Sequence, residues 1–303
     1  MYTRLGVALA RYVQRKSTEY LKDYLSEVDD VTPVKRSTKQ LDSCSACGAL
    51  ELVRRTVTAR SPSLKGKTCE FIICPSCSFI SNPGNVHDYS ALGFDDASSP
   101  DSSPRTGDGQ MPKREYHMAQ MGADILARHS PGQDCEVVVF GAGLSKDHAL
   151  IADDGLFSRV AVCDMENFQA VADFVPHTSR DVQFDAVIAC EVIEHFTDLD
   201  ADFDRLFGKM KDTGLVIAST NICDGAPLHT LLYPFALGHT AYHSGRSLLA
   251  VCERFGMQVD FRTPAISFNG AGPRKRYVLF YKDPRIGECI SQYFADHHVA
   301  PSE

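Results

Sequence analysis

Basic residues are in deficit in this sequence. Its 31 Lys and Arg residues face 39 Asp and Glu residues, which gives a net charge of -8 and a pI near 5.8. A protein dedicated to nucleic acid needs a basic face for phosphate contacts, so this balance argues against that class. Tryptophan is also absent, but 44% hydrophobic and 23% charged residues are typical of an ordinary globular protein.

Long apolar runs are lacking as well. No stretch reaches the roughly 20 apolar residues that a membrane-spanning helix requires. The apolar run near the N-terminus, Leu5 to Ala10, is short and is followed at once by charged residues, without the core and cleavage site of a signal peptide. We therefore expect a soluble, cytoplasmic protein with no membrane partner.

Cysteine, in contrast, is plentiful, and 11 cysteines in a cytoplasmic chain indicate thiols and metal ligands rather than disulfides. Two Cys-x-x-Cys pairs, Cys44 with Cys47 and Cys74 with Cys77, are separated by 26 residues, and Cys69 lies outside both. Two such turns direct four thiolates toward one ion. We predict a zinc ribbon whose Zn²⁺ is structural, because four thiolates leave no position open for substrate. Buried reduced thiols are the alternative.

The chain divides by composition into five segments. Apolar residues at helical spacing predict one or two helices over residues 3–28, and a Ser-, Pro-, Asp- and Gly-rich stretch marks a domain boundary near residues 94–112. The predicted organisation is a helical segment with a linker (1–40), the zinc ribbon (41–93), a flexible linker (94–112), a ligand-binding domain (113–285) and a tail (286–303).

From residue 113 onward, helical segments alternate with apolar runs of Val, Ile and Ala, which predicts a mostly parallel, doubly wound α/β sheet covered on both faces. The expected strands are residues 135–140, 159–163, 184–189, 214–220, 257–261 and 276–282. The expected helices are residues 114–129, 146–155, 166–174, 198–210 and 245–256. In this architecture, ligands bind beyond the carboxyl ends of the strands.

A glycine turn follows the first of these strands. Gly141-Ala142-Gly143 stands between a strand and a helix, where glycines allow a close backbone approach to a ligand. Asp164 ends the next strand about twenty residues later, as expected of an acid that holds a ribose diol. A tight turn with a structural Asp is the alternative, and this pattern alone is shared by nicotinamide-dependent enzymes and methyltransferases.

Together with the segments 184–196, 214–220 and 239–257, this pattern resembles class I S-adenosylmethionine-dependent methyltransferases over about residues 113–285. The resemblance implies that the turn at Gly141, Ala142 and Gly143 passes under the methionine part of the cofactor and that Asp164 holds the ribose. It also implies that Ala189, Cys190 and Glu191 border the cofactor. Two residues before Gly141, where the family usually has an acid, this chain has Val139.

The segment before residue 94 is similar to the zinc-ribbon head of bacterial methyltransferases that modify sugars and natural products. The leading hypothesis is therefore an enzyme that methylates a hydroxyl, or less readily a nitrogen or carbon, of a small molecule, sugar, glycan or natural-product intermediate. A nucleic-acid 2′-O-methyltransferase and a catalytically degenerate binding module are the alternatives.

Glu191, Glu194 and His195 follow the third strand with the spacing i, i+3, i+4, which places them on one face if a helix begins near Glu191. Two carboxylates and an imidazole suit Mg²⁺, Mn²⁺ or Zn²⁺, with His243 preferred over His239 as a fourth ligand. A divalent cation would lower the pKa of an acceptor hydroxyl. Alternatively, His195 acts alone as a general base, or the set only begins a helix.

A loop-rich insertion between the fourth strand and the next helix contains His239, Tyr242 and His243. The resemblance places substrate contacts in this segment. We therefore predict that these three residues bind the acceptor.

Overall fold

The computed structural model describes residues 42–60, 64, 66–87, 107–263 and 275–297. The predicted N-terminal helices, most of the predicted linker and residues 298–303 lie outside the described residues. Every helix in the described part is too short or too polar to cross a membrane.

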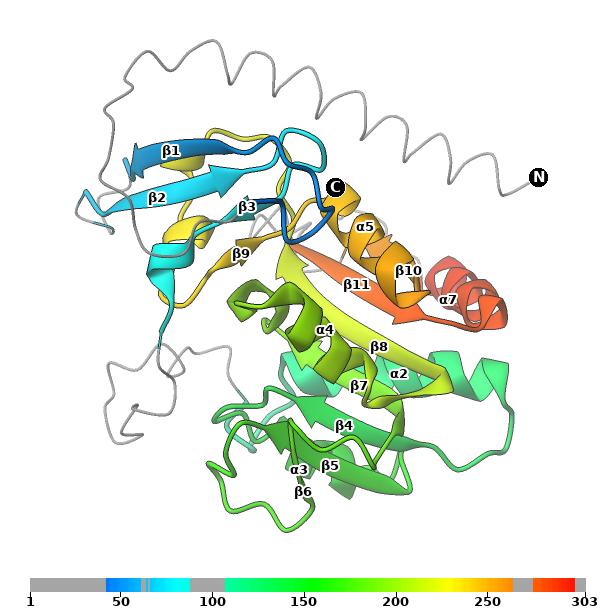
Figure 1. Cartoon of the computed structure of the whole chain (residues 1–303). Coiled ribbons are helices and arrows are strands. Elements are labelled where there is room, and N and C mark those ends of the chain that lie inside the picture. The colour runs from blue at the N-terminus through cyan, green and yellow to red at the C-terminus, as the bar shows by residue number, and fades with distance from the viewer. Residues whose placement is uncertain (1–41, 61–63, 65, 88–106, 264–274, 298–303) are drawn as a thin grey trace, which may run out of the picture.

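The larger sheet confirms the predicted α/β class (Figure 1). Its strands pair in the order β10 (Gln258–Arg262), β11 (Lys275–Tyr281), β8 (Met210–Asn221), β7 (Phe184–Cys190), β4 (Glu136–Phe140), β5 (Arg159–Asp164) and β6 (Phe174–Pro176). β10 and β11 run antiparallel to their neighbours, and the remaining pairs are parallel. The chain moves outward from β4 to β6 and then returns to β7 beside β4. The strand order therefore reverses between β4 and β7, where such folds bind ligands.

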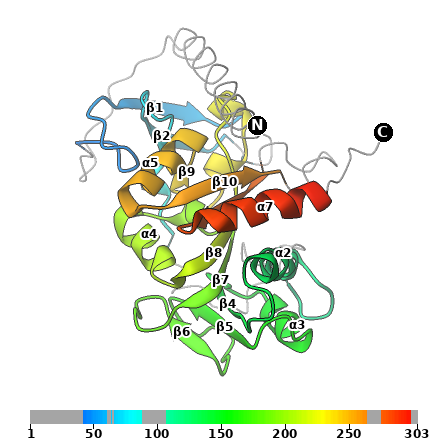
Figure 2. The same cartoon turned by 90° about the vertical axis from the view of Figure 1, so that its right-hand side faces the viewer.

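Helices cover both faces of this sheet (Figure 2). One face carries α2 (Arg114–His129), α3 (Asp147–Asp153) and α7 (Pro284–Asp296), and the other carries α4 (Leu199–Phe207) and α5 (Gly245–Phe255). Alternate strand residues enter opposite layers, since Val137 and Val139 pack with α2 whereas Val138 and Phe140 pack with α4 and α5. The continuous Val and Ile runs of the sequence are explained by burial on both faces.

The second sheet joins the cysteine-containing segment to the large domain. Its order is β1 (Val53–Thr58), β2 (Thr68–Ile73), β3 (Ile80–Ser81) and β9 (Ala241–Tyr242), all antiparallel. β9 comes from the insertion between β8 and α5, so a strand of the large domain completes the sheet of the ribbon (Figure 1). Short 3-10 helices lie at Pro83–Asn85 (η2), Ile193–His195 (η5), Leu228–Thr230 (η6) and Tyr233–Phe235 (η7).

Residues 166–176 and 284–296 differ from the sequence prediction. Up to residue 173, the expected helix 166–174 is replaced by turns and bends, because the side chain of Asn167 bonds both the N–H and the C=O of Val171 and Ala170 adopts a φ of 50°. A short strand, β6, follows where no clear strand was expected. Residues 284–296, assigned mostly to the tail, form α7, which Asp283 caps and which packs against α2.

Candidate functional site

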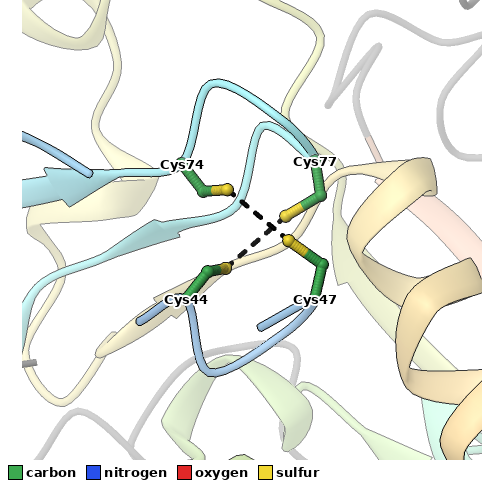
Figure 3. Close-up of side chains that lie close together, drawn as sticks. All are labelled: Cys44, Cys47, Cys74 and Cys77. Atoms are coloured by element: carbon green, nitrogen blue, oxygen red, sulfur yellow. Dashed lines mark hydrogen bonds between the residues drawn. The ribbon is translucent and has the colours of Figure 1, made fainter. Parts of the chain in front are cut away.

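The four paired cysteines meet at one point (Figure 3). Cys44 Sγ lies 3.6 Å from Cys77 Sγ, and Cys47 Sγ lies 3.6 Å from Cys74 Sγ. A tetrahedral site with Zn–S bonds of about 2.3 Å has sulfur atoms about 3.8 Å apart, so the spacing fits one Zn²⁺. Cys69 lies on β2 outside the cluster, as predicted, and the described chain contains no disulfide.

The backbone of each Cys-x-x-Cys turn is built in the same way. The residue after each second cysteine, Gly48 or Ser78, has a positive φ and donates its N–H to the carbonyl oxygen of the first cysteine. A hydrogen bond from Cys77 lowers the pKa of Cys44 to about 5, whereas burial raises that of Cys74 to about 11. Four thiolates can therefore coexist here only with a cation among them.

The glycine turn and Asp164 are in direct contact. Gly141 and Gly143 have φ values of 67° and 53°, and the N–H of Gly143 donates to Asp164 Oδ2 at 2.9 Å. Gln169 secures the far side of the turn by donating to the carbonyl oxygens of Gly143 and Ser145, each at 2.9 Å. The turn and the acid thus form one unit at the carboxyl ends of β4 and β5.

Three other residues expected beside the cofactor lie at or just after the carboxyl ends of β4 and β7. Ala142, Ala189 and Cys190 are buried, and burial raises the pKa of the Cys190 thiol well above its ordinary value. They can supply packing and shape, but Cys190 is not available as a thiolate.

Glu191 does not begin a helix. Its φ is 58°, and the 3-10 helix that follows comprises residues 193–195. The side chains of Glu191, Glu194 and His195 therefore do not share one helix face. Its carboxylate accepts a hydrogen bond from Ser219 Oγ at 2.8 Å and forms an ion pair with Lys275, while Arg114 Nη1 lies 3.8 Å away. Glu191 is therefore neutralised by its own partners.

A cluster forms instead from Glu194, His195 and His239, whose potential metal-ligand atoms all lie within 4.8 Å of one another. We call these three residues the acid and imidazole cluster. Glu194 is fully buried, and burial together with the nearby Glu191 raises its pKa to about 8. His195 donates from Nδ1 to the carbonyl oxygen of Gly238 at 3.0 Å, so any role of its ring as a metal ligand or base would fall to Nε2. Burial lowers the pKa of His239 to about 3, so this imidazole is neutral at physiological pH.

His243 and Tyr242 are placed elsewhere. His243 is fully buried, with its ring between Phe79 and Phe203 and its Nε2 3.3 Å from the carbonyl oxygen of Ile193. It is absent from the cluster that contains His239, contrary to the expected preference. Tyr242 belongs to β9 and is buried in the core of the ribbon sheet. Of the three residues expected to bind the acceptor, His239 is the one that the described structure places with Glu194 and His195.

Three charged or polar residues of this region were not identified from the sequence. The hydroxyl of Tyr233 donates to Glu194 Oε1 and lies 2.8 Å from Thr220 Oγ1. Lys275 and Arg114 neutralise Glu191. Tyr233 could have been noticed because it lies in the same insertion as His239, whereas Lys275 and Arg114 have no local sequence signal.

The ribbon holds the loop that carries His239. Asn85 Nδ2 donates to the carbonyl oxygens of Ala236 (2.5 Å) and His239 (3.1 Å), and Lys67 Nζ donates to that of Phe235 at 2.7 Å. Asn82 adds a bond to the carbonyl oxygen of Pro234. The position of one imidazole of the cluster therefore depends on the cysteine-containing segment.

The sequence matches no protein-family model and no curated protein sequence. Its structure is similar to solved bacterial methyltransferases. One is the methyltransferase domain of bacterial CtHen1-C, with 17% identity, 55% of this chain and 98% of that chain covered, and a TM-score of 0.39. Another is the 1,6-didemethyltoxoflavin-N1-methyltransferase of Burkholderia thailandensis, with 20% identity, coverage of 55% and 78%, and a TM-score of 0.38.

A third similar structure is the plantazolicin methyltransferase BpumL in complex with a substrate analogue and SAH. It has 8% identity, coverage of 55% of this chain and 84% of that chain, and a TM-score of 0.42. Because these likenesses are distant, the function is inferred from the geometry of this chain.

Proposed function

We propose that this protein is an S-adenosylmethionine-dependent methyltransferase that acts on an oxygen of a small molecule, sugar, glycan or natural-product intermediate. The observation that carries the proposal is the single unit formed by the glycine turn and Asp164 beside the point where strand order reverses. Glu194 and His195 follow β7, the strand next to β4 at this reversal, and His239 joins them from the insertion after β8. A cofactor site and an acceptor site thus share one edge of the sheet.

The residues around the turn fit this cofactor. Positive φ values at Gly141 and Gly143 let the backbone approach a ligand, and Asp164 lies at the strand end where a ribose diol would be held. Ser145 Oγ is buried without a hydrogen-bond partner in the described structure, as expected of a group that faces a polar ligand. When bound, the cofactor supplies a sulfonium methyl group for attack by the acceptor oxygen.

The second cluster fits a divalent cation. Glu194 Oε2 and His239 Nδ1 are buried and lack hydrogen-bond partners within the described residues, although each can bind a metal. Two imidazoles with one carboxylate favour Mn²⁺ or Zn²⁺ over Mg²⁺, which prefers oxygen ligands. Such a cation would lower the pKa of an acceptor hydroxyl. Tyr233 keeps Glu194 in place, and Gly238 fixes the ring of His195.

The four-cysteine cluster is proposed to hold a structural Zn²⁺. The acceptor is proposed to be a small molecule or glycan rather than a nucleic acid, because the chain carries a net charge of -8. Catalysis would rest mainly on the alignment of acceptor and cofactor and on exclusion of water, which need few reactive side chains.

Isothermal titration with S-adenosylhomocysteine tests the cofactor assignment. We expect binding in the micromolar range for wild type and at least ~10-fold weaker binding for Asp164→Asn, because the ionised acceptor for the ribose hydroxyls is lost. The exposed Asp212→Asn is the matched control. An absence of binding to zinc-loaded wild type would refute the methyltransferase assignment.

Titration with Mn²⁺, followed by its electron paramagnetic resonance signal, tests the cation site. His239→Ala should abolish binding, whereas His229→Ala should not, because His229 lies in the same insertion but outside the cluster. Equal Mn²⁺ affinity in both variants would reject the cation, and His195 would then be tested as the general base through the pH dependence of turnover.

A further inference from the structure

Two buried carboxylates from different helices meet beside the glycine turn. Glu115 lies in the first turn of α2 with 5% of its surface exposed, and Asp147 is the first residue of α3 and is fully buried. Asp147 Oδ2 accepts a hydrogen bond from the N–H of Tyr116 at 3.1 Å. One oxygen of each carboxyl group, Glu115 Oε2 and Asp147 Oδ1, has no hydrogen-bond partner in the described structure.

This pair of carboxyl groups can hold either a proton or a cation. Burial, together with the adjacent Asp147, raises the pKa of Glu115 to about 7, although Arg114 acts in the opposite direction. Two facing buried carboxylates are stable only with a shared proton, as in the hydrogen bond between Glu115 and Asp147, or with a bound positive charge. No Cys, His or further carboxylate completes a metal site with this pair among the described residues, so an organic cation fits better than a metal.

The position of the pair indicates which cation. α3 begins four residues after Gly143, and the charge of Glu115 reaches Cys190 at the end of β7. The pair therefore lies beside the proposed cofactor site. Val139, where an acid would be expected from the resemblance, is buried and apolar. Arg114, next to Glu115, has a buried Nε without a partner, which suits the carboxylate of an amino acid.

We propose that Glu115 and Asp147 bind the ammonium group at the amino-acid end of S-adenosylmethionine, in place of the acid that this chain lacks at Val139. The inference rests on the proposed function. The pair also requires a glycine at position 107, because a Cβ there would lie 2.2 Å from Asp147 Oδ1 and 2.7 Å from Ser145 Oγ. A side chain at this position would therefore displace the carboxylate of Asp147.

The test compares two ligands that share a nucleoside. S-Adenosylhomocysteine carries the amino-acid end, and 5′-methylthioadenosine lacks it. Glu115→Gln keeps the shape of the side chain. It should weaken the binding of S-adenosylhomocysteine at least ~10-fold while changing the affinity for 5′-methylthioadenosine less than about twofold. The exposed Glu166→Gln serves as the control. Asp147→Asn is the second variant, with its melting temperature measured because Asp147 also holds the N–H of Tyr116.

Proton release gives a readout that does not depend on turnover. Ammonium binding should ionise Glu115, so titrations near pH 7 in buffers of different ionisation enthalpy should show proton release for wild type and less for Glu115→Gln. The described ionisable groups that interact with the Glu115 carboxyl group are Asp147, Arg114 and Cys190. Equal loss of both ligands, or unchanged S-adenosylhomocysteine affinity, would overturn the inference. Failure of wild type to bind either nucleoside would instead refute the proposed function, and this inference with it.

Discussion

The turn after β4 depends on the absence of a side chain at Gly141. Its φ is 67°, and a Cβ would lie 2.8 Å from Val192 Cγ2. Gly141→Ala therefore combines backbone strain with crowding, and we expect it to lower the free energy of unfolding by about 2–4 kcal/mol. Urea denaturation measures the loss. Gly155 has a similar φ of 64° with no atom within 4 Å, so Gly155→Ala should cost only about 1–2 kcal/mol.

Equal losses in the two variants would show that crowding against Val192 contributes nothing. Val192 follows Glu191, so the same contact links the glycine turn to the segment that carries part of the acid and imidazole cluster. A larger residue at Gly141 would thus disturb both sides of the proposed site.

The ribbon positions the insertion between β8 and α5. Asn85, on η2, is buried and holds two carbonyl oxygens near His239. Asn85→Ala leaves both oxygens without this donor, so we expect a loss of about 1–3 kcal/mol in unfolding free energy and ~10-fold weaker Mn²⁺ binding. Urea denaturation and Mn²⁺ titration measure these effects, and the zinc content should stay at the wild-type value.

Thr68→Ala is the control for this variant, because Thr68 lies exposed on β2 and its hydroxyl, within the described part of the chain, bonds Thr58 and Gly66 alone. Its Mn²⁺ affinity should equal that of wild type. If Asn85→Ala were less stable but bound Mn²⁺ normally, Asn85 would support the fold without positioning His239.

Helices and strands with strong local patterns could be predicted from the sequence. The bounds of α2 were predicted correctly because apolar residues recur at helical spacing along it, and the central strands because continuous Val and Ile runs require burial on both faces. The expected helix at residues 166–174 was wrong, because the side-chain bonds of Asn167 to Val171 compete with helical ones.

The candidate site was predicted in part, and the errors arise from long-range contacts. His239 and His243 are four residues apart in one insertion, so local sequence cannot rank them. The bond from Asn85 and the pairing of β9 with β3 decide which imidazole meets Glu194. Glu191 likewise leaves the cluster because of Lys275, a residue 84 positions away in the sequence.

The four-cysteine cluster is expected to stabilise both the ribbon and the insertion of the large domain that packs against it. The hydroxyl of Ser244, the N-cap of α5, donates to the carbonyl oxygen of Cys77, and β3 pairs with β9. Removal of Zn²⁺, or Cys74→Ser, should therefore unfold the ribbon and also loosen the insertion that carries His239. Hydrogen exchange measured by mass spectrometry should show lost protection at residues 68–85 and 234–244, with β4 and β7 unchanged.

The hydrophobic clusters support this expectation. Cys44, Cys74 and Cys77 pack in the same apolar cluster as Phe203 of α4, so the described residues around the four cysteines share the core of the large domain. Loss of protection confined to residues 42–81 would contradict the coupling. Loss across all of β4 to β8 would instead indicate that the chain unfolds as one unit.

The two-residue strand β9 also determines where the chain can be divided. A fragment that starts at residue 107 would keep β9 but lose its partner strand β3, and the buried Tyr242 and Phe235 would lose the ribbon residues that cover them. A separate ribbon would lack its fourth strand. In a chimera between related proteins, therefore, residues 42–87 must be exchanged together with the insertion at residues 222–244, although more than 130 residues separate the two segments.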